Sequence, residues 1–176
     1  MRPSQPRLAP LSKDQIPEEL LKYTGADQGR PLLNIYATVA RHPKLAKRWL
    51  VFGSHVLGKS TLSARERELV ILRTGHLCKS AYEWGQHVRI GKAAGITDAE
   101  IERIMAGPDA PGWAPFDAVL LRSADELHSD SCISDATWQA LAARYSEQQL
   151  LDLIFAIGQY TLVCMALNSL GVQLER

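Results

Sequence analysis

The hydrophobic side chains of this chain recur at intervals of three and four residues, and no stretch sustains a strict alternation of apolar and polar positions. The first pattern is typical of amphipathic α-helices, which make one turn in 3.6 residues, whereas alternation would indicate β-strands. Glycine- or proline-containing segments such as 25–31, 58–61 and 107–112 separate the periodic stretches. We therefore predict an all-α protein in which short loops join antiparallel neighbouring helices.

Three sequences with the pattern of a capping box mark helix starts. They run from Ser63 to Glu66, from Thr97 to Glu100 and from Ser146 to Gln149. In such a box the first hydroxyl and the fourth side chain each bond to a backbone group that the helix leaves free. Together with the periodicity, they predict helices at 17–23, 32–41, 43–56, 63–77, 80–94, 97–106, 114–128, 135–144 and 147–169.

The length and composition favour one main domain. The chain has 176 residues, of which 46% are hydrophobic, as is usual for a globular protein. We interpret residues 1–30 as an N-terminal arm and residues 31–176 as a helical domain, because the proline-rich start has no apolar core and is not a signal peptide. Asp152, Gln159 and Asn168 interrupt the apolar stretch 150–170, which favours a buried helix over a membrane span.

Charge and cysteine content exclude several classes of protein. The net charge is +1, from 20 basic and 19 acidic residues, so we expect no nucleic-acid partner. Cys78, Cys132 and Cys164 form no CxxC pair, and their odd number fits neither a disulfide framework nor a structural zinc site. Reduced thiols favour a cytoplasmic location, and we expect no membrane partner.

The predicted helix 80–94 carries polar side chains on an apolar face. Helical spacing groups Ser80, Glu83 and His87 with Trp84, Ile90, Gly91 and Ala94, so that this face is expected to be buried. Glu83 and His87 are four residues apart, and the carboxylate can orient the imidazole or share its proton. The alternative is a core histidine whose hydrogen bonding Glu83 satisfies.

Three further residues are candidates for a site. Glu68 precedes the apolar run Leu69 to Leu72, where a carboxylate is costly unless it is paired; the alternatives are a helix-end residue that reaches solvent or an ion pair with an arginine. Cys78, at the helix junction, is either a small buried hydrophobe or a thiol whose pKa a helix N-terminus lowers. His55 either lines a pocket or interacts with the dipole of its helix.

We expect no metal, although acidic and imidazole side chains are close together in this part of the sequence. The candidate ligands are Glu68, His76, Glu83 and His87, and their spacing is neither HExxH nor the ExxH of di-iron bundles.

The segment ERELVILRTGHLCKSAYEWGQHVRIGKAAGITDAEIERI, residues 66–104, resembles the carboxymuconolactone decarboxylase family, which includes the alkylhydroperoxidase-D-like (AhpD-like) proteins. The resemblance is most specific at Glu68, Tyr82 to Trp84, His87 and Gly95-Ile96. It implies an AhpD-like helical bundle of about eight helices, with the active site on an antiparallel helix pair. It also implies a homo-oligomer, either a trimer or a hexamer.

The redox branch of the family carries a glutamate, then a CxxC pair, then a histidine. When the histidine is aligned with His87, the glutamate falls on Glu68 and the two cysteine positions fall on Ser80 and Glu83. Because the thiol pair performs the chemistry of that branch, disulfide-cycled peroxide reduction is not expected at these positions. A thiol peroxidase with peroxiredoxin activity, using Cys78 with Cys132 or Cys164, is left as an alternative.

The decarboxylase branch resembles the chain better because it needs no cysteine pair. Its type reaction removes CO2 from a carboxylated unsaturated lactone, whose conjugated ring accepts the electron pair, so we expect no cofactor and a carboxy-lyase-like enzyme with a small-molecule substrate. A second alternative is a non-catalytic oligomeric binding protein. We assign catalysis to Glu68, Glu83 and His87, substrate binding to Ser80, Tyr82, Trp84, Arg73 and His55, and any redox role to Cys78.

Overall fold

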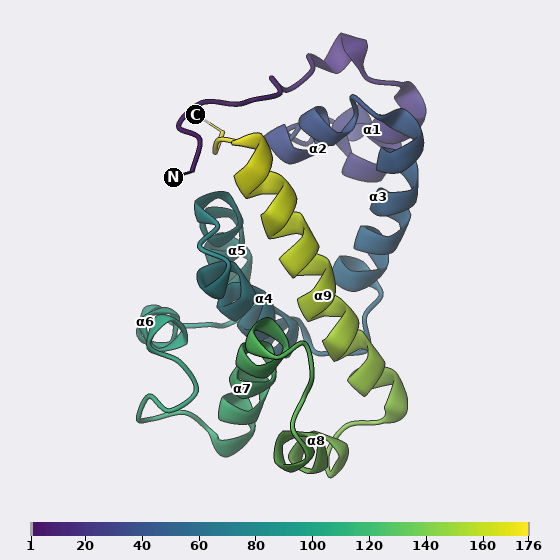
Figure 1. Ribbon diagram of the computed structural model, residues 1–176. Helices are drawn as coiled ribbons and strands as arrows, with labels where there is room; N and C mark the ends of the chain where they lie inside the picture. Colours follow the sequence, from purple (N-terminus) through teal and green to yellow (C-terminus); the bar gives the residue numbers. More distant parts are fainter. Residues whose placement is uncertain (1, 176) are drawn as a thin grey trace. The chain divides into compact units, whose positions relative to one another are not determined.

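The computed structural model of the protein describes residues 2–175, and all regular secondary structure within that range is helical (Figure 1). It contains nine α-helices, eight of them with seven or more residues, two short 3-10 helices and no β-strand in the described part of the chain. The all-α prediction is confirmed.

Each of the nine predicted segments corresponds to one helix, with ends that differ by one or a few residues. The α-helices are α1 Glu18–Thr24, α2 Asn34–Val39, α3 Pro43–Gly58, α4 Ala64–Leu77, α5 Ala81–Ala93, α6 Asp98–Ala106, α7 Pro115–Ser129, α8 Asp135–Ala142 and α9 Glu147–Leu170. The two 3-10 helices, Lys13–Gln15 and Ala26–Gln28, were not among the predicted elements.

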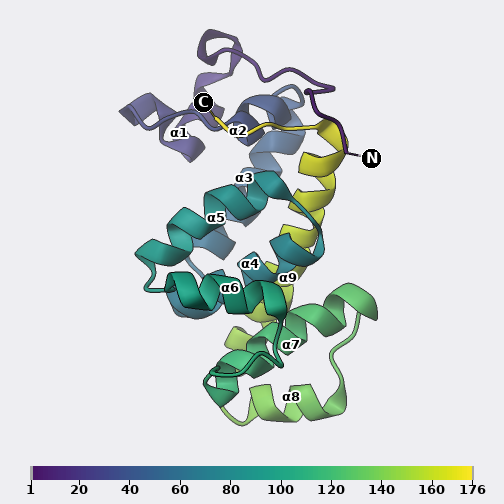
Figure 2. The same ribbon diagram turned by 90° about the vertical axis from the view of Figure 1, so that its left-hand side faces the viewer.

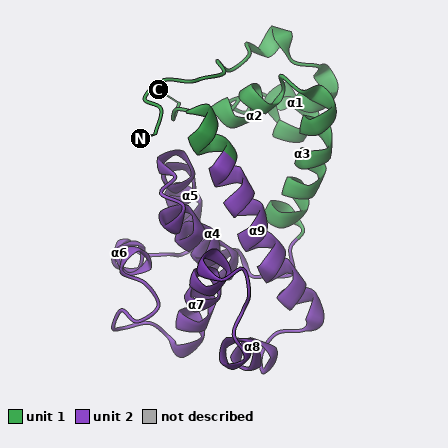
Figure 3. Ribbon diagram, in the orientation of Figure 1, with its two compact units in different colours: residues 1–59, 166–176 green, residues 60–165 purple. Residues whose placement is uncertain are grey.

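The chain divides into two compact units, shown in different colours in Figure 3. Unit 1 comprises residues 1–59 and 166–176, and unit 2 comprises residues 60–165. The arm 1–30 and the domain 31–176 expected from the sequence stay a prediction. The N-terminal segment is held within unit 1 rather than loose: the Arg7 N–H donates to the Leu170 carbonyl at 2.8 Å, and the Leu11 N–H donates to the Ala37 carbonyl at 3.2 Å. Leu11 also packs against the apolar core of unit 1.

Unit 2 is built around α4. Leu69, Val70, Ile71 and Leu72 are all 0% exposed, although four consecutive helical residues point in four directions. Such a run is buried only when neighbours cover the helix on every side, and α4 packs against α5, α6 and α7. Figure 2 shows α5, α6 and α7 close to α4. The most apolar stretch predicted from the sequence is therefore the central helix of this unit.

The long helix α9 is a core helix. It is the one helix in the described chain that is long and apolar enough to cross a membrane, but half of its most apolar window is buried inside the protein. Leu153, Ala156 and Ile157 are 2% exposed or less, and Leu153 and Ile157 belong to the core of unit 2. This burial is typical of a core helix of a soluble protein, as the sequence predicted.

One side of α9 carries an exposed apolar stripe. Leu151, Phe155, Leu162 and Met165 recur at helical spacing, and each is more than half exposed. Stripes of this kind are typical of surfaces that pack against another helix. The homo-oligomer expected from the sequence stays a prediction, and this stripe is a candidate contact surface for it.

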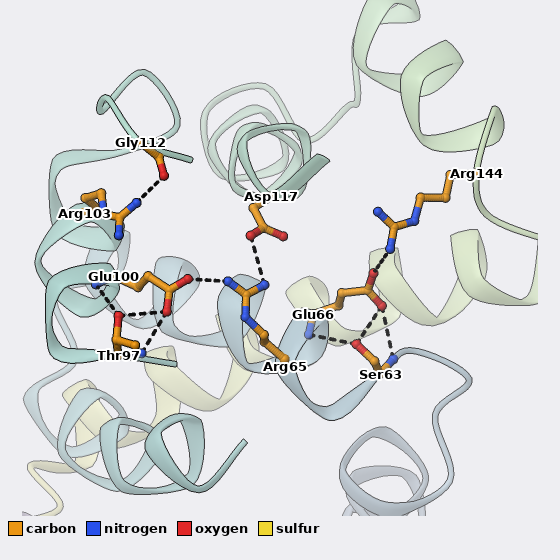
Figure 4. Close-up of polar contacts among 9 residues, drawn as sticks. All are labelled: Ser63, Arg65, Glu66, Thr97, Glu100, Arg103, Gly112, Asp117 and Arg144. Carbon is orange, nitrogen blue, oxygen red and sulfur yellow. Dashed lines mark hydrogen bonds and ion pairs between the residues drawn. The ribbon is translucent and has the colours of Figure 1, made fainter. Parts of the chain in front are cut away.

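The predicted capping boxes of α4 and α6 are formed (Figure 4). At α4 the Ser63 Oγ accepts from the Glu66 N–H at 3.2 Å, and the Glu66 carboxylate accepts from the Ser63 N–H at 3.3 Å. At α6 the Thr97 N–H donates to Glu100 at 2.8 Å. Arg65 links α6 and α7 to α4 because its guanidinium pairs with both Glu100 and Asp117. These contacts fix the helix starts around the candidate site.

Candidate active site

Helices α4 and α5 form a hairpin that reverses the chain within three residues, Cys78 to Ser80. Lys79 adopts a left-handed conformation with φ of 51°, which glycine normally occupies at the end of a helix. The Ser80 N–H donates to the Gly75 carbonyl at 3.0 Å and closes the last turn of α4. The two helices consequently run antiparallel, so that Gly75 faces Glu83 while Glu68, two turns earlier, faces Gly91.

The close approach of the two helices depends on Gly91. A Cβ atom at this position would lie 3.1 Å from Leu72 Cδ1, 3.3 Å from Ile96 Cδ1 and 3.8 Å from Glu68 Cβ. The missing side chain lets α5 pack directly over Glu68. His87 precedes Gly91 by one helical turn and therefore faces the same carboxylate.

The imidazole of His87 lies between two carboxylates. His87 Nδ1 is 2.6 Å from Glu68 Oε2 on α4, and His87 Nε2 is 2.9 Å from Glu83 Oε1 on α5 itself. The side chains of Glu68, Glu83 and His87 are 0%, 5% and 6% exposed. The structure thus brings together the three residues to which the sequence assigned catalysis, and we call this arrangement the Glu-His-Glu relay.

The relay holds a positive charge on His87 at neutral pH. Burial lowers the pKa of His87, but the hydrogen bonds and charges of Glu68 and Glu83 outweigh it and raise the pKa to about 9. Arg67 Nε lies 3.3 Å from Glu68 Oε1 and brings a second cation to the cluster. Two cations then balance two carboxylates, which is the condition under which buried charges are tolerated. Sequence reasoning missed Arg67, because adjacent residues on a helix do not share a face.

Aromatic rings border the relay and its hairpin. Tyr160 of α9 meets His87 edge to face, with ring centroids 4.8 Å apart and an interplanar angle of 80°. Trp84 packs against the core of unit 2, and its ring lies 5.8 Å from that of His76. Tyr82 is also buried, at 5% exposure. The sequence analysis assigned substrate binding to Trp84 and Tyr82, and it did not single out Tyr160.

Ser80 is the N-cap residue of α5 but does not cap it. Its hydroxyl makes no hydrogen bond to the first turn, although Ser80 to Glu83 has the sequence of a capping box. Ser80 is 2% exposed, and its Oγ makes no hydrogen bond of good geometry within the described chain, although it lies beside the Cys164 thiol. Buried hydroxyls are usually bonded, so an unbonded one next to the relay is available to a bound molecule.

Two predicted binding residues lie in other surroundings. Arg73 is buried, and its guanidinium contacts Asp125 at 2.5 Å and 2.9 Å and the Ile104 carbonyl at 2.7 Å. These contacts tie α4 to α7 and to the end of α6, so the guanidinium is engaged in holding helices together. His55 is exposed on α3, in unit 1.

The inward face predicted for α5 is narrower than expected. Ser80, Glu83, His87 and Gly91 are buried, but Ile90 is 39% exposed. Successive residues on a helix are separated by about 100°, so Ile90 lies at the edge of this buried strip that is farther from Gly91, where it is partly open to solvent. The expectation that Ile90 points inward was wrong.

The cysteines differ in exposure, and none belongs to the Glu-His-Glu relay. Cys78 is half-buried, Cys132 exposed and Cys164 buried. Cys78 is the C-cap residue of α4 and lies two residues before Ser80, the N-cap residue of α5. No group of three or more histidine, cysteine, aspartate or glutamate side chains between residues 2 and 175 is arranged to hold a metal ion.

The fold and the site define a class of protein: an all-helical bundle with a buried Glu-His-Glu relay on an antiparallel helix pair. Comparison with known proteins identifies the family. Residues 43–126 match the carboxymuconolactone decarboxylase family. This segment holds the complete relay, and its match is to the same family that the sequence resembles. No curated protein sequence was found to match the chain.

Several solved structures share the fold at low sequence identity. A peroxidase-related protein from Ralstonia eutropha, described as an alkylhydroperoxidase AhpD core, is 15% identical with a TM-score of 0.84, over 99% of this chain and 94% of its own. The debrominase Bmp8, as a cysteine-to-alanine variant with 2,3,4-tribromopyrrole, is 14% identical with a TM-score of 0.80, over 96% of this chain and 91% of its own. An Agrobacterium tumefaciens protein is 18% identical with a TM-score of 0.72, over 78% of this chain and 95% of its own. These similarities confirm the AhpD-like fold.

Proposed function

We propose that the protein is a cofactor-independent acid/base enzyme that acts on a small carboxylated or lactone substrate, in the manner of the decarboxylases of its family. The observation that carries this proposal is the buried relay, in which His87 bridges Glu68 at 2.6 Å and Glu83 at 2.9 Å. A protonated imidazole held between two carboxylates can act as a general acid, because its proton can be transferred to either carboxylate.

The relay can supply the proton that such a reaction requires. Loss of CO2 from an unsaturated lactone leaves an electron pair that spreads into an enolate, and a proton must then reach carbon. His87 Nε2 passes its proton to Glu83, and the resulting carboxyl group delivers it to the substrate carbon. Glu68 keeps the N–H on Nδ1 and so fixes the ring during the transfer. Solvent then restores the proton on His87.

The surroundings of the relay suit an anionic substrate with an apolar body. The Ser80 Oγ can donate to a carboxylate or enolate oxygen, and it lies at the start of α5, where the helix dipole favours an anion. The rings of Trp84 and Tyr160 supply apolar surface near the hairpin. Exclusion of water strengthens each of these polar contacts and favours loss of a charged carboxylate.

Similarity to the solved structures leaves the redox chemistry of the family open, since some of them are described as peroxidase-related. Ser80 and Glu83 occupy the places where the redox branch carries its two cysteines, and a hydroxyl with a carboxylate cannot form a disulfide. Ser80 and Glu83 therefore favour acid/base chemistry over disulfide chemistry at these two positions.

A panel of carboxylated unsaturated lactones and related unsaturated carboxylates tests the proposal. Turnover would be followed in D2O by release of CO2 and by deuterium incorporation at carbon. Glu68→Gln removes the carboxylate that fixes the His87 ring and favours its charged form. We therefore expect it to disable proton transfer by the relay and to lower kcat by about 100-fold or more, the usual contribution of general acid-base catalysis. The matched control is Glu66→Gln, two residues earlier on α4, where the amide keeps the capping box; its kcat should stay within about twofold of the wild type.

Two results would contradict the proposal. One is full activity in Glu68→Gln, which would remove the relay from the reaction. The other is the absence of CO2 release and deuterium exchange with every compound of the panel, which would favour the oligomeric binding protein instead.

A further inference from the structure

The two carboxylates of the relay differ in how many partners hold them. Both oxygens of Glu68 are engaged: Oε2 lies 2.6 Å from His87 Nδ1, and Oε1 lies 3.3 Å from Arg67 Nε. Glu83 has one such contact, from its Oε1 to His87 Nε2 at 2.9 Å, and its Oε2 has no hydrogen bond or ion pair within the described chain. The relay is therefore asymmetric about its imidazole.

Exposure separates the two carboxylates in the same way. The side chain of Glu68 is 0% exposed, whereas that of Glu83 is 5% exposed. Glu83 Oε2 is not among the unbonded side-chain oxygens that the described chain seals from solvent. A small molecule can therefore meet the relay at Glu83, while Glu68 is enclosed.

Arg67 is placed to keep Glu68 charged. Its side chain is 12% exposed, so little water screens the guanidinium from the carboxylate next to it. A cation beside a carboxylate favours its charged form and makes it a weaker proton acceptor. Within residues 2–175 no acidic group other than Glu68 pairs with Arg67, so the charge of the guanidinium acts mainly on this carboxylate.

We propose that Arg67 is a positioning residue that directs the proton of His87 to Glu83. This inference rests on the acid/base function proposed above, in which Glu83 delivers the proton to the substrate carbon. While Arg67 holds Glu68 ionised, the Nε2–H bond of His87 breaks and an O–H bond forms on Glu83, which neutralises both groups. Transfer to Glu68 would instead leave the charge of Arg67 without its partner.

The catalytic triad of serine hydrolases contains a comparable arrangement. There a buried aspartate orients the imidazole and stabilises its charged form, but does not itself take the proton. Glu68 corresponds to that aspartate, and Arg67 supplies the reason why it stays charged. Without Arg67 the imidazole would lie between two carboxylates that compete for its proton, and a proton held on the enclosed Glu68 could not reach the substrate.

Titration of the His87 ring by NMR tests this assignment without any substrate. The charged and titratable groups around the ring are Glu68 and Arg67 from α4, Glu83 from α5 and Tyr160 from α9. Arg67→Met removes the one cation among them, so the pKa of His87 should rise above its wild-type value of about 9. Arg67→Lys keeps a cation and should leave it near that value. An unchanged pKa in Arg67→Met would overturn the inference, because the guanidinium would then not act on the relay.

Steady-state kinetics with a substrate found in the lactone panel separates positioning from contact with the substrate. We expect Arg67→Met to lower kcat by about tenfold while KM stays within about twofold, and Arg67→Lys to recover most of the loss. Because Arg67 acts through Glu68, adding Arg67→Met to Glu68→Gln should lower kcat no further. The matched control is Arg89→Met, at an exposed position of α5, which should leave kcat unchanged.

The kinetics would overturn the inference in either of two ways. A loss in the double variant equal to the product of the two single losses would mean that Arg67 does not act through Glu68. A kcat of Arg67→Met equal to that of the wild type would mean that the guanidinium does not direct the proton. Failure of the acid/base function itself is a different result, namely no turnover of any panel compound by the wild type, and the NMR titration then still decides whether Arg67 acts on the relay.

Discussion

Helices α4 and α5 begin with the same sequence pattern but use it differently. Ser63 to Glu66 and Ser80 to Glu83 both have a serine followed three residues later by a glutamate. At α4 the two side chains cap the helix reciprocally, as Figure 4 shows. At α5 neither bond forms: the Ser80 hydroxyl is unbonded, and the Glu83 carboxylate bonds to His87 instead.

The two helix starts differ because the carboxylates of Glu66 and Glu83 have different additional partners. Glu66 has Arg144 as its outer partner, which leaves its cap bonds intact. Glu83 is 5% exposed and lies one helical turn before a protonated imidazole. A bond to a charged donor is roughly twice as strong as one to a neutral amide, so the carboxylate turns to His87. The lost cap destabilises the helix by about 1 kcal/mol. A capping-box sequence that does not form its cap is therefore typical of a functional site, where stability is given up for another role.

Among the substitutions at α5, replacement of His87 should have the largest effect on the free energy of unfolding. Its folded-state pKa of about 9 exceeds the ordinary value of 6.5, so its stabilising effect is complete below pH 6.5 and is lost as the pH rises through 9. Since one pKa unit corresponds to about 1.4 kcal/mol, the free energy of unfolding at stake is on the order of 3 kcal/mol. Urea denaturation of the wild type and His87→Gln at pH 6.5 and pH 10 measures it.

The difference in free energy of unfolding between the wild type and His87→Gln should shrink as the pH rises, because His87 loses its charge. Other titrating groups affect both proteins alike and cancel in the difference. His55→Gln, at an exposed position of α3, is the control and should track the wild type at both values. A constant difference between wild type and His87→Gln at pH 6.5 and pH 10 would show that the imidazole is not charged in the folded protein.

The two serines should respond differently to the same substitution. Ser63→Ala removes both the hydroxyl that caps α4 and its bond to Glu66, and should lower the free energy of unfolding by about 1 kcal/mol. Ser80→Ala removes a buried hydroxyl that has no bond of good geometry, and should change the free energy of unfolding by less than about 0.5 kcal/mol. Urea denaturation at pH 7 compares them, and Thr97→Ala at α6 should resemble Ser63→Ala. Equal losses for the two serines would mean that Ser80 caps α5 in solution.

The helices were predictable from the sequence because their signals are local. Periodicity, the capping boxes at Ser63 and Thr97 and the breaks at glycine define all nine segments, and the ends differ only by a few residues. The meeting of Glu83 with His87 was predictable for the same reason, since both lie on one helix. The assignment of Glu68 to the same site came from resemblance to a family, and the structure supplies the 2.6 Å contact.

The contacts that the sequence left open depend on how helices pack. Arg73 was a plausible binding cation until the structure placed it between Asp125 and the end of α6. Cys78 at the end of α4 contacts His128 on α7, and no spacing within one helix reveals this contact. The N-terminal segment likewise bonds to Ala37 and Leu170, which its composition does not reveal.

The central claim is that Glu83 leaves its helix cap to hold a charged His87, and titration of the His87 ring by NMR tests it most directly. We predict that the ring is protonated at pH 7 and titrates near pH 9 in the wild type, and that Glu83→Gln lowers this pKa. The Glu66→Gln control should leave it unchanged. A His87 ring that titrates at or below its ordinary value of 6.5 would contradict the relay and the acid/base function proposed from it.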